Sequence, residues 1–140
     1  VKKLGWAPDL IHCHGWMTSL IPLYLKTSYK DEPLFENSKV VTSVYNDCFS
    51  GSLDKDFAKK AIMDGVTTDD VEQFLDPSHT NLCRAAASWS DGIIVGSEES
   101  SKIVEGLDSK PVLEFQGEDY VDAFSDFYDE VLMTEEVLAE

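Results

Sequence analysis

The segment from residue 8 to residue 26 most constrains the fold, because its hydrophobic spacing changes abruptly at Gly15. Before this glycine, Leu10–His14 forms a short run with apolar residues, a length and composition typical of a strand covered on both faces. Between Trp16 and Tyr24 the apolar residues recur every three or four positions, which is the period of a helix. In open α/β sheets such a strand-turn-helix places its turn at the carboxyl end of the strand, where ligands bind. The segment therefore predicts a central parallel strand with Gly15 at the ligand-binding rim.

The rest of the chain alternates between strand and helix patterns. Strands are expected at residues 39–45, 92–95 and 111–115, and helices at 55–63, 67–75, 78–89, 98–107 and 119–138. This order predicts an α/β fold with a doubly wound, mostly parallel sheet and a long amphipathic C-terminal helix. The chain begins with Val1, which indicates a fragment, and a partial sheet of three or four strands would leave an edge exposed. Because exposed edges pair readily, self-association is expected.

Composition excludes several classes of partner and compartment. The formal net charge of −16 argues against binding to nucleic acid or to an anionic membrane surface, since both require cationic patches. No apolar run is long enough to span a membrane, and no segment is typical of a signal peptide. Cys13, Cys48 and Cys83 are odd in number and widely spaced, so they predict neither a disulfide framework nor a zinc ribbon. A reducing cytoplasm is the expected compartment, with no cofactor.

The histidines are the first candidates for chemistry. His12 and His14 lie two residues apart on the expected strand and therefore point to the same side. A zinc site would need a third ligand, and His79 is far along the chain, so no metal is expected. The sequence leaves open whether His12 and His14 face the core or a cleft. Gly92 and Gly96 lack a following lysine, which favours turn glycines over a phosphate-binding loop.

Three segments, in this order along the chain, carry a family resemblance. The first is Pro-Asp-Leu-Ile-His-Cys-His-Gly-Trp at 8–16, followed by Leu-Ile-Pro-Leu-Tyr-Leu at 20–25. The second is the strand at 39–45 with its continuation Asn-Asp-Cys-Phe-Ser-Gly, and the third is Ser-Asp-Gly-Ile-Ile-Val-Gly-Ser at 90–97. Together they resemble the bacterial glycogen synthases and plant starch synthases. The resemblance implies that residues 1–140 are a single partial Rossmann-like domain, the latter part of the N-terminal domain of a two-domain GT-B glycosyltransferase.

The resemblance also implies a reaction and a set of site residues. The family transfers glucose from ADP-glucose or UDP-glucose to an α-1,4-glucan, so an α-glucan or a nucleotide sugar is the implied partner. His14, Trp16 and Asn46 match the family pattern and are the implied substrate-binding residues, although Trp16 could equally be a core residue. Gly15 stands where the family has aspartate, and Tyr45 stands where it has histidine.

These two departures weaken the expected chemistry. Glycine offers no carboxylate, and a tyrosine hydroxyl, which titrates near pH 10, cannot replace imidazole as a proton carrier near neutrality. The family's Lys-x-Gly-Gly loop and its second domain are also outside these 140 residues. The catalytic residues are therefore unknown, and the isolated chain is expected to be inactive. The alternative is a non-catalytic module with the same fold, used for glucan binding, assembly or regulation.

Overall fold

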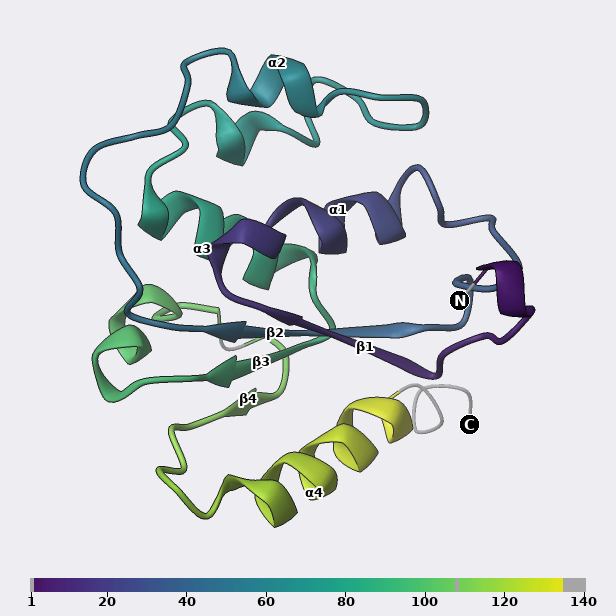
Figure 1. Cartoon of the computed structure of the whole chain (residues 1–140), viewed down its shortest axis with the longest axis vertical. Helices are drawn as coiled ribbons and strands as arrows, with labels where there is room; N and C mark the ends of the chain where they lie inside the picture. The colour runs from purple at the N-terminus through teal and green to yellow at the C-terminus, as the bar shows by residue number, and fades with distance from the viewer. Residues whose placement is uncertain (1, 108, 135–140) are drawn as a thin grey trace.

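A single four-stranded parallel sheet organises the protein, as a computed structural model describing residues 2–107 and 109–134 shows (Figure 1). All neighbouring strands are parallel, and their order in the sheet follows the chain: β1 (Leu10–His14), β2 (Lys39–Val44), β3 (Gly92–Val95) and β4 (Val112–Leu113). The predicted α/β class with a parallel sheet is confirmed, and each predicted strand is present.

Helical segments connect and cover these strands. The α-helices are α1 (Leu20–Lys26), α2 (Phe57–Ala61), α3 (His79–Trp89) and α4 (Tyr120–Met133). The 3₁₀ segments are η1 (Lys2–Leu4), η2 (Trp16–Thr18), η3 (Glu72–Phe74) and η4 (Glu98–Ile103). The helix expected at 98–107 is the 3₁₀ segment η4, where serine hydroxyls bond to nearby backbone: Ser101 donates to the Glu98 carbonyl at 2.9 Å. Of the helix expected at 119–138, residues 135–138 lie outside the described residues.

The helices cover both faces of the sheet, as a doubly wound architecture requires (Figure 1). On one face, Val44 of β2 packs with Cys83 and other residues of α3, while α1 packs beside α3. On the opposite face, Val41 of β2 packs against Phe127 and Val131 of α4. Successive residues of β2 thus point to opposite faces and are buried on both, which explains its nearly continuous apolar sequence. Among the described residues, no helix is long and apolar enough to cross a membrane.

The position of β1 in the sheet differs from the prediction. β1 is parallel to its neighbour, as expected, but it lies at the edge of the described sheet and pairs only with β2 there. Its residues are mostly half-buried, whereas five of the six residues of β2 are buried. A central position is therefore not seen among the described strands, and the exposed edge expected of a partial sheet falls at β1; an apolar run indicates burial on the two faces and does not specify the number of neighbours.

Gly92 and Gly96 are also used differently from the expectation. Neither has the positive φ angle that would mark a turn glycine. Instead both allow close packing on the face covered by α4: a Cβ atom on Gly92 would lie 2.7 Å from Val131 Cγ2 and 3.1 Å from Phe127 Cζ. A Cβ atom on Gly96 would overlap the ring of Tyr45. The two glycines therefore set how closely α4 and Tyr45 approach the sheet.

Lys110 fixes the end of α3 against the beginning of β4. Its Nζ donates to the carbonyl oxygens of Ala87, Ser88 and Ser90 at 3.1, 2.7 and 2.5 Å. Carbonyl groups at the end of a helix lack their full set of intrahelical donors, although the Ala87 carbonyl also accepts from the Ser90 N–H at 3.2 Å, and a cation here complements the helix dipole. Partial burial lowers the pKa of Lys110 from its usual value.

Candidate functional site

His12 lies between the sheet and α4 and is held from both sides. Its Nδ1 atom is 2.7 Å from the Tyr128 hydroxyl, and its Nε2 atom is 2.7 Å from Ser43 Oγ. Burial, with a smaller contribution from neighbouring His14, lowers the pKa of His12 to about 4. The imidazole is therefore neutral near pH 7, and the two hydroxyls satisfy both of its nitrogens. His12 is consequently a structural residue that attaches α4 to β1 and β2.

His14 occupies the exposed end of the same strand. Its ring stacks on that of His12 with a centroid separation of 3.9 Å, and its Nδ1 atom is 2.9 Å from the Tyr45 hydroxyl. Tyr45 follows the last residue of β2, and its ring lies over Gly96 at the end of β3. The two residues that the sequence singled out at the ends of β1 and β2 are thus hydrogen-bonded to each other.

A pocket of about 320 Å³ opens beside this pair. Its lining includes the residues at or just after the carboxyl ends of all four strands and the first turns of α4: His14, Tyr45, Val95, Gly96, Phe115, Gln116, Gly117, Tyr120 and Phe124. Three of these side chains are aromatic rings from the C-terminal part of the chain, and none of the lining residues is lysine, arginine, aspartate or glutamate. The pocket can therefore stack against a flat face and exchange hydrogen bonds with neutral polar groups, but it offers no cation to a phosphate.

The loop after β2 brings a carboxylate that the sequence did not predict to the turn after β1. Gly15 adopts a φ of 72°, and a Cβ atom built on it would lie 3.3 Å from Asp47 Oδ2. The carboxylate of Asp47 thus approaches the position where a longer side chain at residue 15 would begin. A usable signal existed in the sequence, because Asp47 comes shortly after the end of a parallel strand, where functional side chains collect.

The other two predicted substrate-binding residues lie outside the pocket. Trp16 is half-buried and packs against the core on the face of the sheet opposite to α4, with its ring edge-on to Phe49 at 4.7 Å. Asn46 is exposed at the rim beside Tyr45, and its backbone N–H donates to Ser97 Oγ at 3.0 Å. The structure therefore brings His14 and Tyr45 together, places Gly15 and Asn46 next to them, and directs Trp16 to the core.

The three histidines are not gathered into one cluster. His79, at the start of α3, contacts Asp47 and Cys48 instead of His12 or His14. Over residues 2–107 and 109–134, no group of three histidine, cysteine or acidic side chains is arranged to hold a metal ion.

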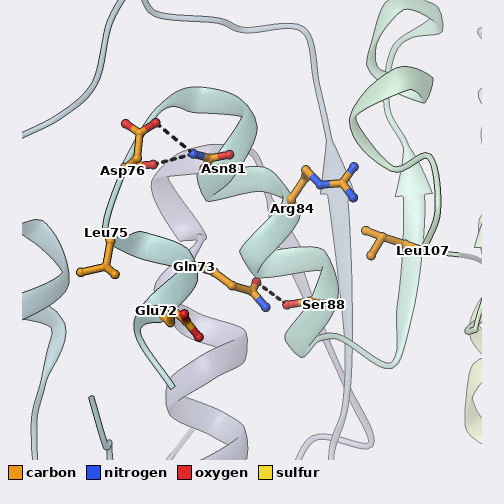
Figure 2. Close-up of a pocket in the computed structure, with 8 residues that line it drawn as sticks. All are labelled: Glu72, Gln73, Leu75, Asp76, Asn81, Arg84, Ser88 and Leu107. Carbon is orange, nitrogen blue, oxygen red and sulfur yellow. Dashed lines mark hydrogen bonds between the residues drawn. The ribbon is translucent and has the colours of Figure 1, made fainter. Parts of the chain in front are cut away.

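A larger pocket, of about 410 Å³, lies on the outer side of α3 (Figure 2). It is lined by residues of η3, the turn after it, α3 and Leu107, and by none from the strands. Several of its polar groups are already paired within the protein: Asn81 Nδ2 donates to the Asp76 backbone carbonyl oxygen at 2.8 Å, and the Ser88 hydroxyl donates to Gln73 Oε1 at 2.8 Å. We therefore place the candidate site at the smaller pocket, where the strand ends converge.

Comparison with known proteins gives one consistent family. Residues 1–109 match the family described as the starch synthase catalytic domain. A glycogen synthase of Photobacterium profundum is 33% identical over 109 residues, which cover 77% of this chain and 21% of that protein. A glycogen synthase of Clostridium perfringens is 30% identical over 108 residues, covering 75% of this chain and 22% of that protein.

A shorter match has a higher identity but covers less of the chain. A glycogen synthase of Chlorobium luteolum is 51% identical over 51 residues, covering 36% of this chain and 10% of that protein. The chain thus spans about a fifth of the length of the first two relatives. No solved structure matches it. The matched family region ends at residue 109, so β4, α4 and the aromatic residues they bring to the pocket lie beyond it.

Proposed function

The chain belongs to the starch synthase catalytic domain family. We propose that the 320 Å³ pocket at the strand ends forms one side of the glucose-binding site of a glycogen or starch synthase-like glycosyltransferase. In this proposal, residues 1–140 form part of one Rossmann-like domain. The full protein transfers glucose from ADP-glucose or UDP-glucose to an α-1,4-glucan. The 140 residues alone bind the glucan and do not catalyse the transfer.

The observation that carries the proposal is the composition of the pocket at the strand ends. Phe115, Tyr120 and Phe124 present aromatic rings, and His14 and Tyr45 present hydrogen-bonding groups beside them. The C–H face of a glucose ring packs on an aromatic ring, while its hydroxyl groups need neutral donors and acceptors. Within the described residues, the His14 Nε2 atom makes no hydrogen bond, so it is available to a sugar hydroxyl.

The same composition argues that the nucleotide sugar requires residues outside this chain. The diphosphate of ADP-glucose carries negative charge that develops further as the glucosyl group leaves, and cationic groups stabilise it. None of the pocket residues is a cation, and the chain as a whole has a net charge of −16. Donor binding would therefore depend on the remaining four fifths of a protein as long as the matched relatives.

A second candidate is a non-catalytic glucan-binding, assembly or regulatory module. Gly15 and Tyr45 favour it, because they remove a carboxylate and an imidazole from positions where the family pattern has them. The approach of Asp47 to Gly15 favours the enzyme, since it supplies a carboxylate near one of those positions. Both candidates bind glucan, and they differ in whether the full-length protein transfers glucose.

Titration calorimetry and NMR titration of the 140-residue chain test the shared claim. We expect maltoheptaose to bind and ADP-glucose to give no saturable signal. Tyr120→Ala removes one exposed ring from the pocket and should weaken maltoheptaose binding at least threefold, because an aromatic contact contributes about 1 kcal/mol. The matched control is Tyr29→Ala, which removes a tyrosine away from the pocket. The two side chains are similarly exposed, Tyr29 at 39% and Tyr120 at 48%.

Two results would contradict the proposal. Micromolar binding of ADP-glucose by the chain would show that the donor does not need the missing residues. Equal maltoheptaose affinity in the wild type and in Tyr120→Ala would show that the pocket is not the glucan site. Transfer assays on the full-length protein then separate the enzyme from the non-catalytic module.

We also propose that the 140-residue chain self-associates along β1. This strand pairs only with β2 among the described strands, so its outer edge is open to a second copy. Sedimentation velocity that shows only monomer at high concentration would contradict this. A cytoplasmic location remains part of the proposal, and the three unpaired cysteines support it.

A further inference from the structure

Cys48, His79 and Asp47 form a cluster outside the glucan pocket. The Cys48 sulfur is 3.4 Å from His79 Nδ1, and the opposite ring nitrogen, Nε2, is 3.1 Å from Asp47 Oδ1. Cys48 and Asp47 are exposed on the loop after β2, while His79 is buried as the first residue of α3. A nucleophile, a base and a group that orients the base are thus within reach of one another.

Asp47 fixes the tautomer of His79 and therefore which ring nitrogen presents a lone pair to the Cys48 sulfur. A carboxylate only accepts hydrogen bonds, so the His79 Nε2 atom carries the hydrogen in this contact. In the neutral ring, Nδ1 is then the acceptor, and it points at the Cys48 thiol. The ring is also held in place by Phe49, whose ring meets it edge-on at a centroid distance of 5.9 Å. The imidazole is therefore oriented to take the thiol proton.

The thiol has a second polar neighbour in Asn46. The thiol has one hydrogen, which it can donate either to Asn46 Oδ1 at 3.1 Å or, after rotation about the Cβ–Sγ bond, to His79 Nδ1 at 3.4 Å. After the proton has moved to His79, rotation of the amide would present its NH₂ group to the thiolate instead. Both neighbours can thus stabilise the charged sulfur.

The other two cysteines are in the opposite situation. Cys13 and Cys83 are buried, and burial raises the pKa of Cys13 to about 11 and that of Cys83 to about 12. Cys83 also lies near His79, 3.7 Å from Nε2, but this nitrogen already faces Asp47. A thiol reacts only where it can form the thiolate and where a reagent can reach it. Cys48 is exposed and lies beside a base, whereas Cys13 and Cys83 are buried, so Cys48 should be the more reactive.

We propose that Cys48 is a selectively modified thiol that reacts with low-molecular-weight disulfides, with His79 as the base that accepts its proton. The proton passes to His79 Nδ1, and the thiolate attacks one sulfur of the disulfide. A new sulfur–sulfur bond forms to Cys48 as the bond within the reagent breaks. The released thiolate then takes up a proton, so no external oxidant is needed. The product is a mixed disulfide beside Asn46 at the rim of the sheet.

The test uses the 140-residue chain with glutathione disulfide and with 2,2′-dithiodipyridine, followed by intact mass and peptide mapping. We expect one adduct, on Cys48, formed at least about tenfold faster in the native chain than in the same chain unfolded in urea at the same pH. Cys48→Ser should abolish the fast adduct, whereas Cys13→Ser, which removes a buried thiol, should leave its rate unchanged. His79→Gln should reduce the native rate to that of the unfolded chain.

If His79→Gln does not fold, the reaction rates of Cys48 in the native and in the unfolded wild-type chain still distinguish the outcomes. A native rate at Cys48 equal to or below the unfolded rate would overturn it. A first adduct on Cys13 or Cys83 would overturn it as well, as would an unchanged rate in a folded His79→Gln variant.

Discussion

The neutral imidazole of His12 makes the stability of this protein depend on pH in a calculable way. In the unfolded chain this histidine takes up a proton near its ordinary pKa of 6.5, whereas in the folded chain burial and His14 hold the pKa at about 4. Between these two values the unfolded state binds more protons than the native state. The free energy of unfolding is therefore highest above pH 6.5 and decreases as the pH falls towards 4.

The magnitude follows from the same two values. From pH 7.5 to pH 5.0, a shift from 6.5 to about 4 corresponds to a loss of about 2 kcal/mol. His12 is only half-buried, so solvent screens part of this effect, and we expect a loss of about 1 kcal/mol. In His12→Gln the position cannot take up a proton, and this contribution should disappear.

Urea unfolding of the wild type and of His12→Gln at a series of pH values between 5.0 and 7.5 measures the effect. The carboxylates that also titrate at the acid end are common to both proteins, so the difference between the two curves isolates His12. An NMR titration of the His12 ring should independently show a midpoint near 4. Parallel stability curves for the two proteins, or a midpoint near 6.5, would refute the reasoning.

Three further substitutions test the packing around the site. Gly92→Ala should cost about 1–3 kcal/mol of unfolding free energy, because the new methyl group would overpack Phe127 of α4; a urea midpoint equal to that of the wild type would contradict this. Gly96→Ala should displace the Tyr45 ring and shift the ring resonances of its histidine partner, so an unchanged NMR spectrum of that histidine would count against the described geometry. Lys110→Met should cost about 1 kcal/mol by removing the ammonium that donates to the carbonyls of Ala87, Ser88 and Ser90 at and just after the end of α3, and equal thermal unfolding of the variant would show that water replaces it.

The candidate site was only partly readable from the sequence. His14 and Tyr45 stood out because each follows a strand pattern, and parallel strands end at the same edge of a sheet. The three aromatic residues that line the pocket, Phe115, Tyr120 and Phe124, could not be assigned to the site from the sequence, because they lie far along the chain and outside the family match. The roles of Asp47 and Cys48 were missed for a similar reason: their partner His79 is 32 and 31 residues away.

The sequence alone determined the secondary structure, which depends on residues close to one another along the chain. The change from strand spacing to helical spacing around Gly15, and the β-branched residues of β2 and β3, predicted four parallel strands and their connecting helices because side-chain periodicity is a local property. Tertiary structure alone decided that β1 lies at an edge of the described sheet, that the half-buried Trp16 packs against the core, and that Gly92 and Gly96 are contact points. Each of these features depends on contacts between residues that are far apart in the sequence, and local sequence patterns do not specify such contacts.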